Sequence, residues 1–131
     1  MNAYAQTWAP RVLSVLRIVT AFLFLLHGTA KILHWPHQAM FDNLQLMSLF
    51  GVQGLIELVG GVLLLVGLFS RWTAFVLSGD MAFAYFIGHF PKGWLPVLNG
   101  GDAAVLYCFV FLYLWLAGPG PWSLDARLRK A

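Results

Sequence analysis

The sequence has few charged residues and a single cysteine. Only 10% of its 131 residues are charged, and five acidic residues face eight lysines and arginines. Because Cys108 is the only cysteine, an intramolecular disulfide, a Cys-x-x-Cys redox pair and a thiolate metal cage are all excluded. If this protein transfers electrons, it does not do so with a dithiol of its own.

The excess of basic over acidic residues does not indicate a nucleic-acid partner. The net charge is +3, but the basic residues are scattered and form no stripe interleaved with aromatic residues. Hydrophobic residues make up 60% of the chain, which is more than a water-soluble core can absorb. We therefore expect a small membrane protein whose main partner is the lipid bilayer. No repeat or low-complexity linker divides residues 1–131, which predicts a single domain.

Four apolar runs predict four membrane-spanning helices. A spanning helix needs about 20 mostly apolar residues. The runs cover residues 12–33, 49–69, 72–90 and 101–118. The last is short for a crossing, so we expect Gly100 and Gly101 to belong to its helix. The predicted fold is an all-α, four-helix transmembrane bundle.

A shorter helix is expected between the first two spans. In residues 34–48, apolar side chains recur at the spacing of a helix, at Met40, Phe41, Leu44 and Met47. Polar residues occupy the rest of the turn. This pattern predicts a short amphipathic helix that lies in the membrane interface.

The distribution of basic residues predicts the orientation in the membrane. With four spans, the two termini and the loop between spans two and three share one side. That side carries Arg11, Arg71, Arg127, Arg129 and Lys130. The other side carries Lys92, with Lys31 near its border. Because positive residues are retained inside, both termini are predicted to be cytoplasmic.

The first span carries three ionisable residues, Arg17, His27 and Lys31. Such groups are costly inside a bilayer and usually face partners on other helices. Counting depth along antiparallel helices places Asp80 within reach of Arg17. We therefore predict that these two residues form a structural ion pair that fixes the register of the helices.

The second span combines a carboxylate with small residues on one face. Gly54, Glu57 and Gly61 fall close together at 100° per residue. Glycine on such a face lets another helix backbone approach closely. We expect Gly54 and Gly61 to be packing positions and Glu57 either to pair with a basic residue of the first span or to take up a proton.

A second polar group is predicted near the outer ends of the helices. Its members are His27, Lys31, Glu57, His89 and Asp102. Two interpretations remain open: a small-molecule pocket, built mainly from Glu57, His27 and Lys31, and a purely structural cluster. His27 and His89 could also ligate a haem, but two membrane histidines carry little spacing information. We therefore predict no metal site.

Three segments together resemble one protein family. They are LLHGTAKIL in the first span, ELVGGVLLLVGLFSRWTA with its Glu-x-x-Gly-Gly and Gly-x-x-x-Arg spacing, and the ending LAGPGPWSLD. Over residues 12–128 the chain resembles the DoxX family of small bacterial membrane proteins. The resemblance implies a four-helix bundle in the bacterial cytoplasmic (inner) membrane. It also implies an association with quinone-linked oxidases or thiosulfate:quinone oxidoreductases and with thiol and oxidative-stress systems. It carries no catalytic motif onto Glu57 or His27.

The leading functional hypothesis is an accessory or quinone-interacting component of a membrane redox system. Lys31 and His27 would donate hydrogen bonds to a quinone, Glu57 would carry a proton, and the seam at Gly54 and Gly61 would accept the tail. Quinone is the candidate cofactor, and no catalytic residue is assigned. Two alternatives remain: a small-solute binding or transport protein, which would need to form a homo-oligomer, and a structural subunit that packs against a redox partner.

Overall fold

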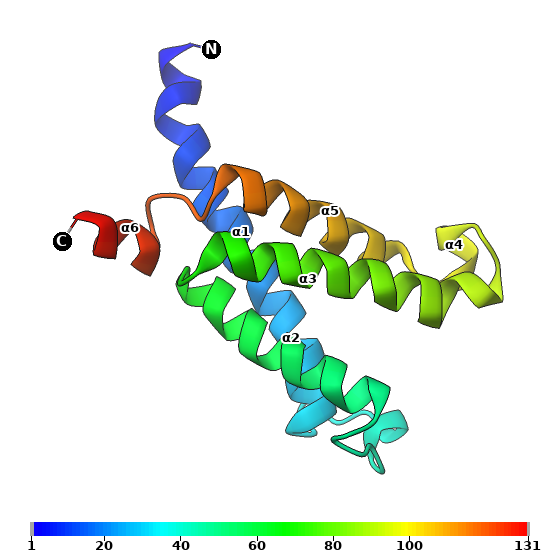
Figure 1. Cartoon of the computed structure of the whole chain (residues 1–131). Coiled ribbons are helices and arrows are strands. Elements are labelled where there is room, and N and C mark those ends of the chain that lie inside the picture. Colours follow the sequence, from blue (N-terminus) through cyan, green and yellow to red (C-terminus); the bar gives the residue numbers. More distant parts are fainter. Residues whose placement is uncertain (1, 131) are drawn as a thin grey trace.

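The structure, a computed structural model, describes residues 2–130, and this part of the chain contains helices, turns and loops without strands (Figure 1). The α-helices are α1 (Ala3–Ile32), α2 (Leu49–Val66), α3 (Ser70–Ala84), α4 (Pro96–Asn99), α5 (Asp102–Ala117) and α6 (Leu124–Lys130). The predicted all-α class is confirmed. Within the described residues, α1 and α2 are long and apolar enough to cross a membrane, and α5 is a shorter apolar helix.

The four long helices form two pairs. Helix α1 packs along α2, and α3 packs along α5. The pairs meet where α2 turns into α3 and diverge toward their other ends, so that the molecule is closed at one end and spread at the other (Figure 1). This divergence positions the cavity described below.

Two helix limits differ from the predicted spans. Helix α1 already begins at Ala3, because the Asn2 side chain accepts a hydrogen bond from Ala5 N at 2.8 Å and caps it. Helix α3 ends at Ala84 and continues as a π-helical turn, Tyr85–His89, and a 3₁₀ turn, Phe90–Lys92. Hydrophobicity locates the apolar run, whereas the cap and the turn decide where the helix begins and ends.

The predicted amphipathic helix over residues 34–48 is wrong in extent, because the structure forms a single 3₁₀ turn there, Ala39–Phe41. Pro36 restricts the residue before it to extended conformations. His37 Nε2 lies 2.7 Å from Asp42 Oδ1, so a local side-chain contact competes with a continuing helix. The segment is therefore a loop across the spread end of the molecule.

Helices α1 and α2 approach each other through glycines. A Cβ on Gly28 would lie 2.6 Å from Leu58 N, and a Cβ on Gly61 would lie 3.0 Å from Leu25 Cα. Gly54 lies equally close to Lys31, with 2.9 Å between an added Cβ and the lysine Cβ. Both predicted packing glycines thus lie against α1, and Gly28 adds a third contact from the other helix.

The apolar core lies where the two helix pairs meet. Its fully buried members come from all four long helices and include Phe24, Leu64, Leu77, Phe111 and Leu114. Phe24 and Phe111 join the pairs through an edge-to-face contact, with ring centroids 4.9 Å apart. This core holds α1 against α5 at the level just inside the closed end.

Arg17 closes that end of the molecule, and its predicted ion pair with Asp80 is wrong. The guanidinium, 1% exposed, donates from Nε to Leu64 O and from Nη2 to Trp122 O, both at 2.8 Å, and from Nη1 to Pro119 O. The contacts of Gly28 with Leu58 and of Gly61 with Leu25 set the register of α1 against α2, and this register places Arg17 beside the last turn of α2. Asp80 lies in the third turn of α3, away from that level, and interacts with Gln53 instead.

Asp125 fastens the C-terminal segment to the start of α3. Its carboxylate accepts hydrogen bonds from Phe69 N and Ser70 N, both at 2.9 Å. Burial acts to raise the pKa of Asp125, but the hydrogen bonds from Ser70 and Phe69, with the nearby charge of Arg129, outweigh it and lower the pKa. Asp125 therefore serves as the N-terminal cap that α3 lacks in its own sequence.

We expect Gly28→Ala to destabilise the protein and Gly79→Ala not to. The added methyl at position 28 meets the α2 backbone, which cannot move aside, and overpacking of this kind costs about 1–3 kcal/mol. At Gly79, no atom from outside the local helix backbone lies within 4 Å of an added Cβ, and alanine improves helix propensity by up to about 1 kcal/mol. Thermal unfolding in detergent measures both. Equal midpoints for the two variants would contradict the close approach of α1 and α2.

We expect Asp125→Ala to lower the stability by about 1 kcal/mol at neutral pH, as the loss of an N-cap does. Asp125→Asn keeps one acceptor and should lose less. Because the folded pKa is lowered below the ordinary value of 3.8, the contribution is fully present above about pH 4 and is lost as the pH falls through the folded pKa. Unfolding of wild type and Asp125→Ala from pH 7 to pH 3 should show the two curves converging only at the acid end.

Candidate functional site

A cavity of about 530 Å³ lies between the two helix pairs at the end where they diverge. Its walls come from α1, α2, α3, the π-helical turn, α5 and the loop between α1 and α2. Most of the lining is apolar and includes Phe24, Phe41, Leu44, Phe50, Met81 and Ala104. A concave, mainly apolar site with a few polar groups is typical of a small-molecule site.

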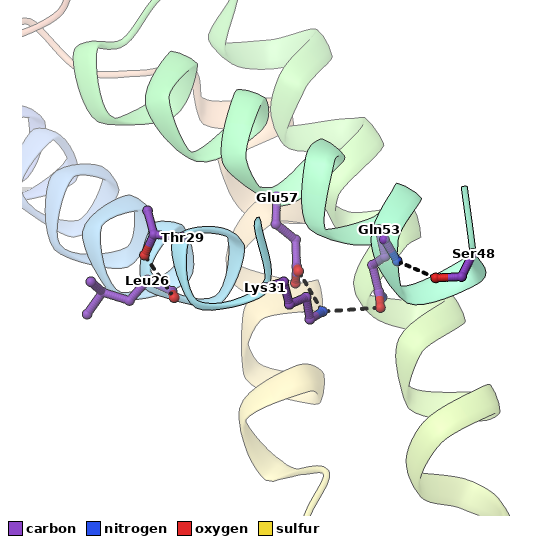
Figure 2. Close-up of polar contacts among 7 residues, drawn as sticks. Leu26, Thr29, Lys31, Ser48, Gln53 and Glu57 are labelled. Atoms are coloured by element: carbon purple, nitrogen blue, oxygen red, sulfur yellow. Dashed lines mark hydrogen bonds and ion pairs between the residues drawn. The ribbon is translucent and has the colours of Figure 1, made fainter. Parts of the chain in front are cut away.

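The polar part of the cavity centres on Lys31. Figure 2 shows Lys31 reaching from α1 to α2, where Nζ lies 2.7 Å from Glu57 Oε1 and 3.3 Å from Gln53 Oε1. Gln53 and Glu57 are one helical turn apart and so share a face of α2. Glu57 is 2% exposed and the Lys31 side chain 11% exposed. The predicted basic partner of Glu57 is therefore Lys31.

Local packing explains how Lys31 reaches this position. Gly54 lies between Gln53 and Glu57 on the same helix, and the stem of Lys31 lies directly against it. A larger residue at position 54 would push the stem away from α2. The ammonium also lies 5.9 Å from the centre of the Phe41 ring, which the loop between α1 and α2 supplies. The charge is thus enclosed on three sides by residues of this chain.

An aromatic wall faces this charged pair. Tyr107 of α5 lines the cavity and makes an edge-to-face contact with His27 of α1, with ring centroids 6.0 Å apart. Tyr107 also stacks on Phe111 with 5.9 Å between ring centroids. His27 lies one turn before Lys31 on α1 and lines the same cavity. The wall therefore combines flat apolar surface with two groups that can form hydrogen bonds.

His89 lines the cavity from the π-helical turn on the other helix pair. Its Nδ1 lies 3.1 Å from Asn99 O, and its ring stacks on Tyr85 with 6.3 Å between ring centroids. The Asn99 side chain donates to Gly93 O at 2.7 Å, which fixes the loop that holds it. Among the residues that the structure describes, no three His, Cys, Asp or Glu side chains gather as metal ligands would.

Four of the five predicted site residues therefore line one cavity, and Asp102 does not. Asp102 is exposed in the first turn of α5 and is absent from the cavity wall. Two residues of the cavity were missed, Gln53 and Tyr107. The spacing of Gln53, four residues before Glu57 in an apolar helix, could have identified it, whereas Tyr107 resembles any aromatic residue of an apolar helix.

A second, smaller cavity of about 280 Å³ lies between α2 and α3. Gln53 lines both cavities, and Asp80 lines only the smaller one. Asp80 is half-buried, and its Oδ2 atom is buried without a hydrogen-bond partner. The structure thus places Asp80 beside the Lys31 cluster, on the far side of Gln53.

Comparison with known proteins identifies the family. A model of the DoxX family matches residues 12–90. The chain belongs to the DoxX family. An uncharacterized protein of Haemophilus influenzae is 43% identical over 95% of this chain and 96% of its own length. An uncharacterized membrane protein of Mycobacterium tuberculosis is 32% identical (92% and 83%), and the inner membrane protein YqjF of Escherichia coli is 30% identical (88% and 91%). No solved structure matches.

The resemblance predicted from the sequence is therefore confirmed, and the chain is a DoxX-family membrane protein. The matched region contains α2, α3 and most of α1, and with them every ionisable residue of the cavity wall except Tyr107 and Lys92. Helix α5 and the C-terminal segment that holds Arg17 lie beyond the match. The charged cluster thus belongs to the part of this chain that the family model describes.

We expect the buried charges to be energetically coupled. Lys31→Met leaves the Glu57 carboxylate buried without its cation, and breaking such a pair costs on the order of 3 kcal/mol. The double variant Lys31→Met/Glu57→Gln removes both charges and should recover much of that loss. Lys92→Met, which removes an exposed lysine of the same cavity, should change stability by less than about 0.5 kcal/mol. A thermal-unfolding cycle with no coupling would contradict the pair.

Proposed function

We propose that this protein is a four-span bundle of the bacterial inner membrane, with both termini in the cytoplasm. Its spans are α1, α2, α3 with the π-helical turn that continues it, and α5. The support is that α1 and α2 have spanning length and hydropathy and that α3 is extended by five further helical residues. The Escherichia coli relative is named an inner membrane protein. In this orientation, the closed end with Arg17 faces the cytoplasm and the cavity lies toward the outer side.

We further propose that the cavity binds a quinone headgroup and that the protein is a quinone-site subunit of a membrane redox system. The observation that carries this is a buried, paired lysine in the wall of a mainly apolar cavity. A quinone ring is flat and apolar, and its carbonyl oxygens accept hydrogen bonds. It therefore needs an apolar slot with a few well-placed donors.

The donors come from three residues of the wall. The Lys31 ammonium has three N–H groups, and Glu57 and Gln53 accept two of them, which leaves one for a ligand. His27 and Tyr107 can form a second hydrogen bond from the aromatic wall. Glu57 is placed to exchange a proton with the bound ring through Lys31. Because the sequence supplies no dithiol, the electrons would come from a partner subunit.

The shape of the molecule supports a ligand with a long apolar tail. The two helix pairs diverge where the cavity lies (Figure 1). An isoprenoid tail can then remain in lipid between the pairs while the headgroup enters the site. The same shape suits other small amphipathic molecules, but the paired cation opposite an aromatic wall favours a flat ligand with carbonyl oxygens.

We expect a short-chain quinone analogue to bind the purified protein in lipid nanodiscs. Glu57→Gln and Lys31→Ala should each weaken binding about 10-fold or more, because hydrogen bonds to charged groups contribute about 1.5–3 kcal/mol. The matched control is Asp102→Asn, which neutralises an acidic side chain outside the cavity wall and should leave the affinity unchanged. Isothermal titration calorimetry measures all four proteins.

Equal affinity of wild type and Glu57→Gln would rule out this site. Two further results would favour the alternative functions. Flux of a solute into vesicles that depends on Glu57 would indicate a transport protein. A stoichiometric partner whose activity survives both substitutions would indicate a structural subunit.

A further inference from the structure

Asp80 is an ionisable residue that the proposed quinone site does not use. Its Oδ2 atom is buried without a hydrogen-bond partner, although the residue lies within a proposed membrane span. An ionised carboxylate in this setting is expensive, because Asp80 makes no ion pair with a cation of the described residues. A carboxyl group that stays there needs either a proton or a neighbouring positive charge.

The only positive charge of the cluster is already paired. Lys31 Nζ donates a hydrogen bond to Glu57 Oε1 at 2.7 Å, and this is its shortest polar contact. Asp80 is near the hydrogen-bonding amide of Gln53, the like charge of Glu57 and the opposite charge of Lys31. Helix α5 packs on α3 through Ser78, which donates to Cys108 O at 2.8 Å, and adds no charged group to this set. With all three groups ionised, the cluster would carry a net charge of −1.

Gln53 links Asp80 to the charged pair. Its Oε1 accepts a hydrogen bond from Lys31 Nζ at 3.3 Å. Its amide nitrogen can therefore donate a hydrogen bond to the carboxyl group of Asp80. Gln53 is 8% exposed, and its side chain forms part of the wall of both cavities. The order Glu57, Lys31, Gln53, Asp80 therefore forms a continuous polar chain from the larger cavity to the smaller one.

We propose that Asp80 is the proton-binding group of this cluster. One proton on Asp80 makes the cluster neutral, and its binding or release breaks no other bond. Leu49, the first residue of α2, lies about one helical turn beyond Gln53 and, like Gln53, lines both cavities. The two cavities therefore adjoin at the outer end of α2, and Asp80 lines only the smaller one.

The use of this proton rests on the proposed quinone site. The binding of the proton by Asp80 does not. A quinone that is reduced at the larger cavity takes up protons. A protonated Asp80, linked to the larger cavity through Gln53 and Lys31, can supply one of them. The binding of a proton by Asp80 can therefore be measured on the protein without any quinone.

The test is infrared difference spectroscopy of the protein in lipid. At about pH 6, ordinary exposed carboxyl groups, with pKa values near 4, are ionised. Wild type should then still show a protonated-carboxyl C=O band that shifts on exchange into D₂O. Asp80→Asn should lose this band, and the matched Asp102→Asn variant should keep it. The band should persist in sodium-free and sodium-containing buffer alike.

Three outcomes would overturn the inference. A band that is unchanged in Asp80→Asn shows that another group holds the proton, and a band lost in Glu57→Gln but kept in Asp80→Asn identifies Glu57 as that group. A band that sodium abolishes shows that the carboxyl group binds a metal cation instead. A wild-type protein that fails to bind the quinone analogue but shows the Asp80 band would contradict the proposed function alone.

Discussion

The hydrogen bonding of Arg17 determines the shape of the whole molecule. A guanidinium cannot lose its charge, so a buried arginine needs acceptors for its donors wherever the chain places it. Here the acceptors are carbonyl oxygens of Leu64, Pro119 and Trp122, which come from the end of α2 and from the segment after α5. One side chain thus ties three parts of the chain together at one level, and the helix pairs can diverge only at the other end.

The two basic residues of α1 are stabilised in different ways, and the difference explains the different character of the two ends. At the closed end, a folded tail brings backbone carbonyls close enough to surround Arg17. At the spread end there is no such tail, so the charge of Lys31 is balanced by Glu57 and Gln53 from the neighbouring helix. Arg17 is buried outside the cavity, where its remaining N–H groups cannot reach a ligand, whereas Lys31 lines the cavity and has one N–H group beyond its two acceptors. The spread end is therefore the end that can bind a molecule.

The sequence predicted the parts of the structure that depend on side-chain type and spacing. The apolar runs, the glycine contacts of α2 and the need of Glu57 for a basic partner all follow from such patterns. The partners of Arg17 could not be predicted in this way, because every residue has a carbonyl oxygen and none is marked by its side chain. The depth estimate that paired Arg17 with Asp80 aligned Val12 with the end of the second span, whereas the close contacts of Gly28 and Gly61 place Arg17 beside Leu64 at that end.

The charged and the aromatic parts of the cavity wall come from different helices, and this division affects which ligands the cavity could select. The residues that balance charge, Lys31, Gln53 and Glu57, lie in the region that the family model matches, while Tyr107 lies on α5 beyond it. The charge pair constrains α1 and α2 tightly, since removing either partner leaves a buried charge. The aromatic wall has no such constraint, because one flat apolar side chain can replace another without leaving an unpaired group. Selection between flat ligands of different size is therefore expected to depend on α5, while the hydrogen bonds of the charged cluster come from α1 and α2.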